Sequence, residues 1–186
     1  EHQLSNALVA VMVTKYLGAK DKTIIGTIAK FKGLPHRLQL VRSIKVKQNY
    51  INFFDDSAST NPQTAAVAIA AFKNPVILIA GGKDKNLDFK PLKKAIKCLN
   101  VRNVVLYGEN RHKIAKQINV KRCNVVMKKT LKEAVGQSFK LAKQFQHSNN
   151  SRDITILLSP ASASFDQFKD YKHRGDEFKR IVKTLK

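Results

Sequence analysis

The sequence has little of what several large protein classes require. Its 186 residues include no tryptophan, two cysteines, five prolines and eight glycines, a composition that excludes collagen-like and low-complexity chains. Cys98 and Cys123 lack the C-x-x-C spacing of metal sites, so we expect reduced thiols in a cytoplasmic protein. No apolar run approaches the roughly 18 residues of a membrane span, and neither a signal peptide nor a membrane partner is predicted.

Acidic residues are also scarce. The sequence has 35 Lys and Arg residues but only 13 Asp and Glu residues, which gives a formal charge of +22. Residues 81–150 hold 17 of the basic residues and 4 of the acidic ones, and lysines recur there at the spacing of solvated helix faces. Lysine dominates over arginine, which does not favour bidentate phosphate recognition. A basic module that binds nucleic acid is kept as an alternative and not as the main hypothesis, because no RNA-binding aromatic motif, zinc finger or Arg-rich arm occurs.

The hydrophobic pattern predicts an α/β fold. Helices are predicted over 3–17 and 22–31, and two β-rich runs at 38–44 and 50–54 could form a hairpin. Strands are then predicted at 76–80, 101–106, 124–127 and 154–158, and helices at 61–71, 89–99, 111–118, 131–145 and 176–185, with a polar loop at 146–152. Repeated strand–helix units imply a Rossmann-like, mostly parallel sheet with helices on both faces, preceded by a short helical segment.

Polar loops follow three of these strands, at 55–62, 81–85 and 159–168. Ligands of such sheets bind beyond the carboxyl ends of the strands. Lys85 would supply positive charge, Thr60 and Ser164 hydroxyl groups, and the N–H groups near Ser164 and Phe165 an anion-binding nest. Each loop alone also fits ordinary turn chemistry and helix capping. The three together favour a site for a small polar anion.

The sequence lacks the motifs of a hydrolytic or nucleotide-cleaving centre. The sequence contains no G-x-x-x-x-G-K-[ST] phosphate loop, no G-x-G-x-x-G and no G-x-S-x-G, and its five histidines lack metal-ligand spacing. We therefore predict no catalytic residue and no metal site in this chain.

Four strings of residues resemble a known family. In order they are GLPHR (33–37), DDSASTNP (55–62), GGKDKNLDF (81–89) and LLSPASASFDQFKDYKHRGDEF (157–178). They resemble the C-terminal part of the bacterial Mur ligases. The opening His2–Ala7 resembles the H-N-x-x-N-A helix at the end of that family's central ATPase domain. The resemblance, together with the lack of an initial Met, implies that residues 1–33 are the tail of an ATPase domain and residues 34–186 a C-terminal, Rossmann-like amino-acid-binding domain.

The resemblance also implies an activity. It is strongest to the branch that adds D-glutamate to UDP-N-acetylmuramoyl-L-alanine in peptidoglycan synthesis, where ATP activates a carboxylate and the glutamate amine attacks it. ATP and Mg²⁺ would serve the full-length enzyme, while this fragment alone would be an inactive monomer with no ligand bound. A related ligase that uses another amino acid is the alternative, although the DNPR motif of the diaminopimelate- and lysine-adding relatives is absent.

Residue roles follow from the resemblance by position. The residues that match ATP contacts are Asn6, Arg37 and Asp56, the last two acting on domain closure. The residues that match glutamate contacts are Thr60, Lys85, Ser164, Phe165 and Tyr171. This sequence departs from the family pattern at Ala58, where a lysine is usual, at Gln3, where Asn is common, and at Ser162, where Cys is common. With Ala58 in place, Lys85 is expected to be the only cation in the amino-acid motifs.

Overall fold

The computed structural model describes residues 2–98, 100–121, 123–148 and 152–186, and the chain divides into two units after Leu34. The first unit contains the helices α1 (His2–Tyr16) and α2 (Asp21–Lys30), joined at Gly18, whose φ is +82°. Both helices begin one residue before the predicted ranges. Apolar side chains such as Met12 and Ile25 are exposed along them. The assignment of this unit to the end of an ATPase domain stays a prediction.

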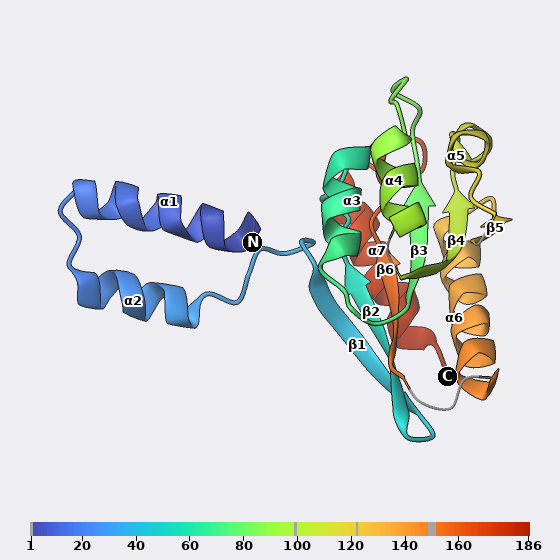
Figure 1. Cartoon of the computed structure of the whole chain (residues 1–186), viewed down its shortest axis with the longest axis horizontal. Helices are drawn as coiled ribbons and strands as arrows, with labels where there is room; N and C mark the ends of the chain where they lie inside the picture. The colour runs from blue at the N-terminus through green and yellow to red at the C-terminus, as the bar shows by residue number, and fades with distance from the viewer. Residues whose placement is uncertain (1, 99, 122, 149–151) are drawn as a thin grey trace. The chain divides into compact units, whose positions relative to one another are not determined.

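The second unit, Pro35–Lys186, is built around one six-stranded sheet (Figure 1). Its strands are β1 (Gln39–Val46), β2 (Asn49–Asp55), β3 (Val76–Gly81), β4 (Val101–Tyr107), β5 (Asn124–Met127) and β6 (Ile154–Leu158). The strand order is β1-β2-β6-β3-β4-β5. The β1–β2 hairpin is antiparallel and all other neighbours are parallel. The predicted Rossmann-like α/β fold class is confirmed.

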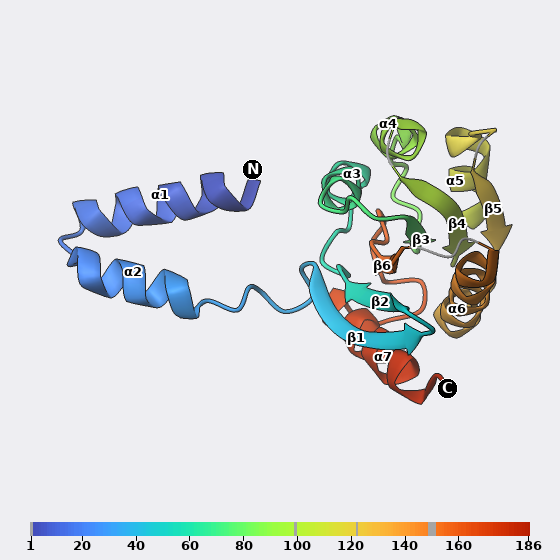
Figure 2. The ribbon, with the colours of Figure 1, turned by 60° about the horizontal axis from the view of Figure 1, so that its bottom comes forward.

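Helices cover both faces of this sheet (Figure 2). On one face lie α3 (Pro62–Ala70), α4 (Lys90–Cys98) and α5 (Arg111–Ile118), and on the other α6 (Leu131–Ser148) and α7 (Tyr171–Thr184). Successive strand residues point to opposite faces, so Leu78 packs under α3 and α4 while Ile77 and Ile79 pack under α6 and α7. This double burial explains the continuous apolar run of β3. No helix in the described ranges has the length and apolarity to cross a membrane.

Two helices of this unit differ from the prediction by three residues or more at one end. Helix α7 begins at Tyr171 and not at Asp176, because Asp170 caps it by accepting the N–H of His173 at 2.8 Å. Helix α6 continues past Phe145 to Ser148, into the predicted polar loop. Gln146 is buried there because its Nε2 donates to the carbonyl oxygens of Tyr50 and Arg152, both at 3.3 Å. The rest of that predicted loop, 149–151, lies outside the described residues, as does Leu99 at the predicted end of α4.

Candidate functional site

The three polar loops meet at the carboxyl edge of the sheet. Their strands β2, β6 and β3 are neighbours, so the loops that follow them emerge side by side. Ala161 of the third loop donates its N–H to the carbonyl of Ser59 in the first loop at 3.0 Å. Lys83 of the second loop donates its N–H to the carbonyl of Ala163 at 2.9 Å. The convergence expected from the sequence is therefore present.

Lys85 and Phe165 come from different loops and contact each other. The Nζ of Lys85 lies 5.2 Å from the centroid of the Phe165 ring, and 60% of Phe165 is exposed. The neighbouring Lys83 is engaged elsewhere, since its Nζ lies 2.7 Å from Glu109 Oε2. Lys85 makes no ion pair within the described part of the chain. Of these two lysines, Lys85 is thus the one whose amine is open to an anion.

Ser164 and Thr60 border the same edge. Ser164 is buried, and its carbonyl accepts the N–H groups of Gln167 at 3.2 Å and Phe168 at 2.9 Å in a tight turn. The N–H groups of Ser164 and Phe165 themselves donate to no acceptor in the described ranges, as an anion-binding nest requires. Thr60 is half-buried and donates its N–H to the carbonyl of Ala58 at 3.0 Å.

Arg37 and Asp56 differ in their exposure. Arg37 is exposed and donates from Nη1 to Ser59 Oγ at 3.3 Å. Asp56 is buried: its Oδ1 accepts the N–H of Leu38 at 3.3 Å and its Oδ2 accepts the hydroxyl of Ser159 at 2.7 Å. Burial raises the pKa of the Asp56 carboxyl above its ordinary value, although these hydrogen bonds and the charge of Arg37 act in the opposite direction. The carboxylate therefore serves contacts within the loops.

Tyr171 opens helix α7 and joins the same edge. Its carbonyl accepts the hydroxyl of Ser57 at 2.7 Å, and its ring meets the ring of His36 edge-on at 6.1 Å. Asn6, the remaining residue predicted to contact ATP, is exposed on α1 in the first unit. Its predicted role is not tested by this arrangement.

Arg174 is a part of this edge that the sequence reasoning missed. It is fully buried and donates from Nε to Ser57 Oγ, from Nη2 to the Ser57 carbonyl and from Nη1 to the Ser162 carbonyl, each at 2.9 Å. Arg174 thereby joins the loop after β2 to the loop after β6. Lys85 is thus not the only cation of the matched strings, which corrects the expectation above. The signal was an arginine four residues before Phe178, on the apolar stripe of α7.

A buried His–Asp contact beside Tyr171 was also missed. His36 Nδ1 lies 2.8 Å from Asp55 Oδ2, and Lys179 Nζ lies 3.6 Å from the same oxygen. Gly175 of α7 makes room for the pair, since a Cβ there would collide with the His36 ring and the Asp55 carboxylate. His36 itself has a φ of +60°. These contacts fix Arg37 and Asp56, the next residues along the chain in each case.

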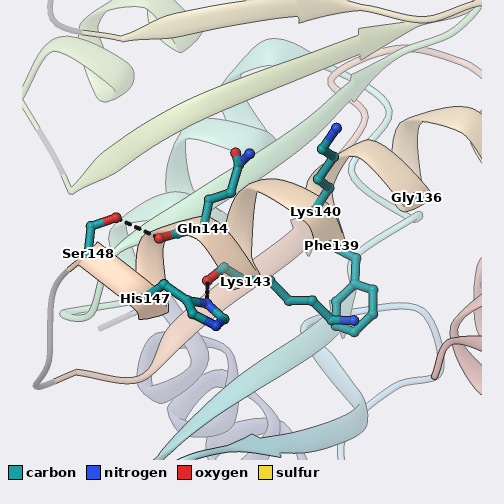
Figure 3. A pocket seen from close by; sticks show the side chains of 7 residues that line it. All are labelled: Gly136, Phe139, Lys140, Lys143, Gln144, His147 and Ser148. Atoms are coloured by element: carbon teal, nitrogen blue, oxygen red, sulfur yellow. Dashed lines mark hydrogen bonds between the residues drawn. The ribbon is translucent and has the colours of Figure 1, made fainter.

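A separate hollow lies on the surface of α6 (Figure 3). Its lining residues are Gly136, Phe139, Lys140, Lys143, Gln144, His147 and Ser148. All come from one helix, and two of their side chains bond back to carbonyls of that helix: Ser148 Oγ to Gln144 at 2.6 Å and His147 Nδ1 to Lys143 at 2.6 Å. None of the residues predicted from the sequence lies here, so the carboxyl edge is the better candidate site.

Known proteins are similar to this chain in sequence. The model of the family "Mur ligase, glutamate ligase domain" matches residues 36–161. UDP-N-acetylmuramoylalanine–D-glutamate ligases are 37% identical in Prochlorococcus marinus and 39% identical in Lactobacillus acidophilus, both over 188 residues, and 39% identical in Caldicellulosiruptor bescii over 186 residues. Each comparison covers 100% of this chain and 38% of the relative. The chain therefore spans about two fifths of the length of these relatives.

Solved structures share the fold at low sequence identity. A folylpolyglutamate synthase of Mycobacterium tuberculosis complexed with ADP superimposes with a TM-score of 0.66 at 17% identity, over 100% of this chain and 41% of that one. A UDP-N-acetylmuramate–alanine ligase of Thermotoga maritima gives 0.61 at 14% identity, over 100% of this chain and 38% of that one.

Proposed function

Because this chain belongs to the Mur ligase family, we propose that the full-length protein joins D-glutamate to UDP-N-acetylmuramoyl-L-alanine with consumption of ATP. The observation that carries the proposal is the meeting of Lys85, Phe165 and Ser164 at one edge of the sheet. Support for the substrates comes from relatives that are 37–39% identical over this whole chain and are named for this pair of substrates.

The carboxyl edge would hold the amino acid. D-Glutamate carries two carboxylates, and each needs positive charge or hydrogen-bond donors. The exposed amine of Lys85 supplies the charge, and the N–H groups of Ser164 and Phe165 supply donors without a partner in the described structure. Thr60 would add a hydroxyl, and Tyr171 a ring beside the loop. Fixing both carboxylates orients the amine, which lowers the entropic part of the barrier to amide formation.

ATP would be held mainly by parts of the protein outside this chain. Arg37 is exposed and fits a phosphate contact, whereas Asp56 is buried and fits the support of the loop. The described residues contain no group of three or more His, Cys, Asp or Glu residues able to hold a metal ion. When bound, ATP supplies the phosphoryl group that activates the acceptor carboxylate.

The test is an assay of the full-length protein with purified UDP-N-acetylmuramoyl-L-alanine, ATP and either D- or L-glutamate. We expect release of phosphate together with an amide product, dependent on D-glutamate. The 186-residue chain alone should release no phosphate above a buffer control. A full-length protein that makes product with another amino acid, and none with D-glutamate, would refute the proposed substrate. Phosphate release by the chain alone would refute the assignment of ATP to the remaining parts.

A further inference from the structure

The side chain of Asn110 connects two of the three loops, the one after β3 and the one after β6. Asn110 lies in the turn between β4 and α5 and is 3% exposed. Its Oδ1 accepts the N–H of Gly82 at 3.0 Å, and its Nδ2 donates to Ser162 Oγ at 2.9 Å. Its backbone N–H also donates to the carbonyl of Gly82 at 3.1 Å. One side chain thus bridges the loop that carries Lys85 and the loop that carries Ser164.

The two loops approach each other too closely for their spacing to vary freely. The main chains meet where Lys83 donates its N–H to the Ala163 carbonyl at 2.9 Å. Gly82 has a φ of +147°, and a Cβ at this position would collide with the same carbonyl. Ser162 is held from both sides, by Asn110 at its hydroxyl and by Arg174 at its carbonyl. Asn110 is a buried side chain that bonds to both loops, so its bond to Ser162 helps to set this spacing.

We propose that Asn110 and Ser162 act as a positioning pair, which sets the distance between the Lys85 and Ser164 loops and thereby the affinity for glutamate. The inference rests on the proposed function. The two carboxylates of a dicarboxylate lie a limited distance apart, so the two groups of residues that bind them must keep a matching distance. ATP does not depend on this spacing, because Arg37 lies on another segment. The pair acts through the loops and does not touch the substrate.

The kinetic test uses Asn110→Ala, Ser162→Ala and the double variant of the full-length protein. Ser162→Ala should raise the KM for D-glutamate about five- to tenfold, the equivalent of one neutral hydrogen bond that holds the binding arrangement. Asn110→Ala also removes the acceptor of the Gly82 N–H, so it should raise this KM at least as much. The KM for ATP should stay within twofold. The double variant should match Asn110→Ala, because the two residues act as one unit. Independent, multiplying effects would contradict the pairing.

A matched control exists at the opposite edge of the same strands. Asn74 Nδ2 donates to Thr155 Oγ1 at 2.8 Å and joins the start of β3 to β6, where Thr155 is buried. Asn74→Ala and Thr155→Val remove the same kind of bond, so they should lower the melting temperature to a similar degree and leave the KM for D-glutamate within twofold. An equal rise of KM in these variants would show general loosening and overturn the proposal.

A second measurement does not depend on activity. Hydrogen exchange of the Lys83 amide reports whether the two loops stay together, because this N–H bonds to Ala163. We expect faster exchange in Asn110→Ala and Ser162→Ala and unchanged exchange in Asn74→Ala. Unchanged exchange in the first two variants would overturn the positioning role even if the enzyme used another amino acid. A wild-type protein inactive with D-glutamate would refute the proposed function alone.

Discussion

Replacing Lys85 by alanine tests the charge at the candidate glutamate site. The side chain is exposed and its amine forms no ion pair within the described structure, so the change removes a cation without leaving a buried group unsatisfied. Within the described residues its amine contacts the ring of Phe165, whose centroid lies 5.2 Å from Nζ. We expect weaker binding of glutamate and little change in the stability of the fold.

The size of the effect follows from three contributions. A charge-assisted contact to a carboxylate contributes about 1.5–3 kcal/mol. Solvent screening at an exposed site reduces this, and the competing contact with the Phe165 ring is worth about 0.5–1 kcal/mol. A net loss near 1.4 kcal/mol corresponds to a factor of about ten in affinity. The KM for D-glutamate should therefore rise about tenfold.

The assay measures initial rates of the full-length protein against D-glutamate at saturating ATP. Lys143→Ala is the matched control, because Lys143 Nζ also lies over an aromatic ring, 4.2 Å from the centroid of Phe139, on α6. Both variants should retain the melting temperature of the wild type, and only Lys85→Ala should change the KM for glutamate. A KM within twofold of the wild type in Lys85→Ala would show that Thr60, Ser164 and the backbone amides hold the carboxylates without it.

Four further substitutions separate the other roles. Arg37→Ala should raise the KM for ATP without changing the melting temperature, and unchanged ATP kinetics would remove Arg37 from the site. Gly175→Ala should lower the free energy of unfolding by about 1–3 kcal/mol through its collision with His36 and Asp55, whereas Gly136→Ala, with open space around it, should raise it by about 0.5–1 kcal/mol. Asp56→Asn should become more stable relative to the wild type as the pH rises from 3.8, the ordinary pKa of Asp, through the raised pKa of the folded state. The reason is that only the wild type must ionise a buried carboxyl. A stability difference between the two proteins that is constant with pH would contradict this.

The elements of the second unit were largely predictable because their signals are local. The ranges of α5, β5 and β6 agree with the prediction at both ends. A continuous apolar run marked β3 and a mostly apolar run marked β6, and both strands are buried on both faces. The start of α7 was not predictable in this way. Gly175 is unfavourable inside a helix, and the contact that requires it comes from His36, far away in the chain.

Some residues of the candidate site were likewise predictable from the sequence, and others were not. The strand-end rule and the matched strings located Thr60, Lys85, Ser164 and Phe165, because loops after neighbouring parallel strands must emerge together. They did not reveal Asn110, which lies 28 residues from Gly82 and 52 residues from Ser162. Contacts over such separations depend on the strand order, and the sequence pattern predicts a parallel sheet without fixing which strands are neighbours.

Exposure divides the residues of this edge into two groups more clearly than their motifs do. Lys85 and Phe165 are exposed, whereas Asn110, Ser162 and Arg174 are buried with their polar atoms bonded inside the protein. Removing one partner of a buried polar contact leaves the other unsatisfied, which costs more than the loss of an exposed contact. Variants of the buried group should therefore lower the melting temperature and the affinity together, and variants of the exposed group the affinity alone. Ser162 and Arg174 of the buried group occur in the same matched string as Phe165, so only a comparison of stability with KM separates residues that hold the substrate from residues that hold the loops.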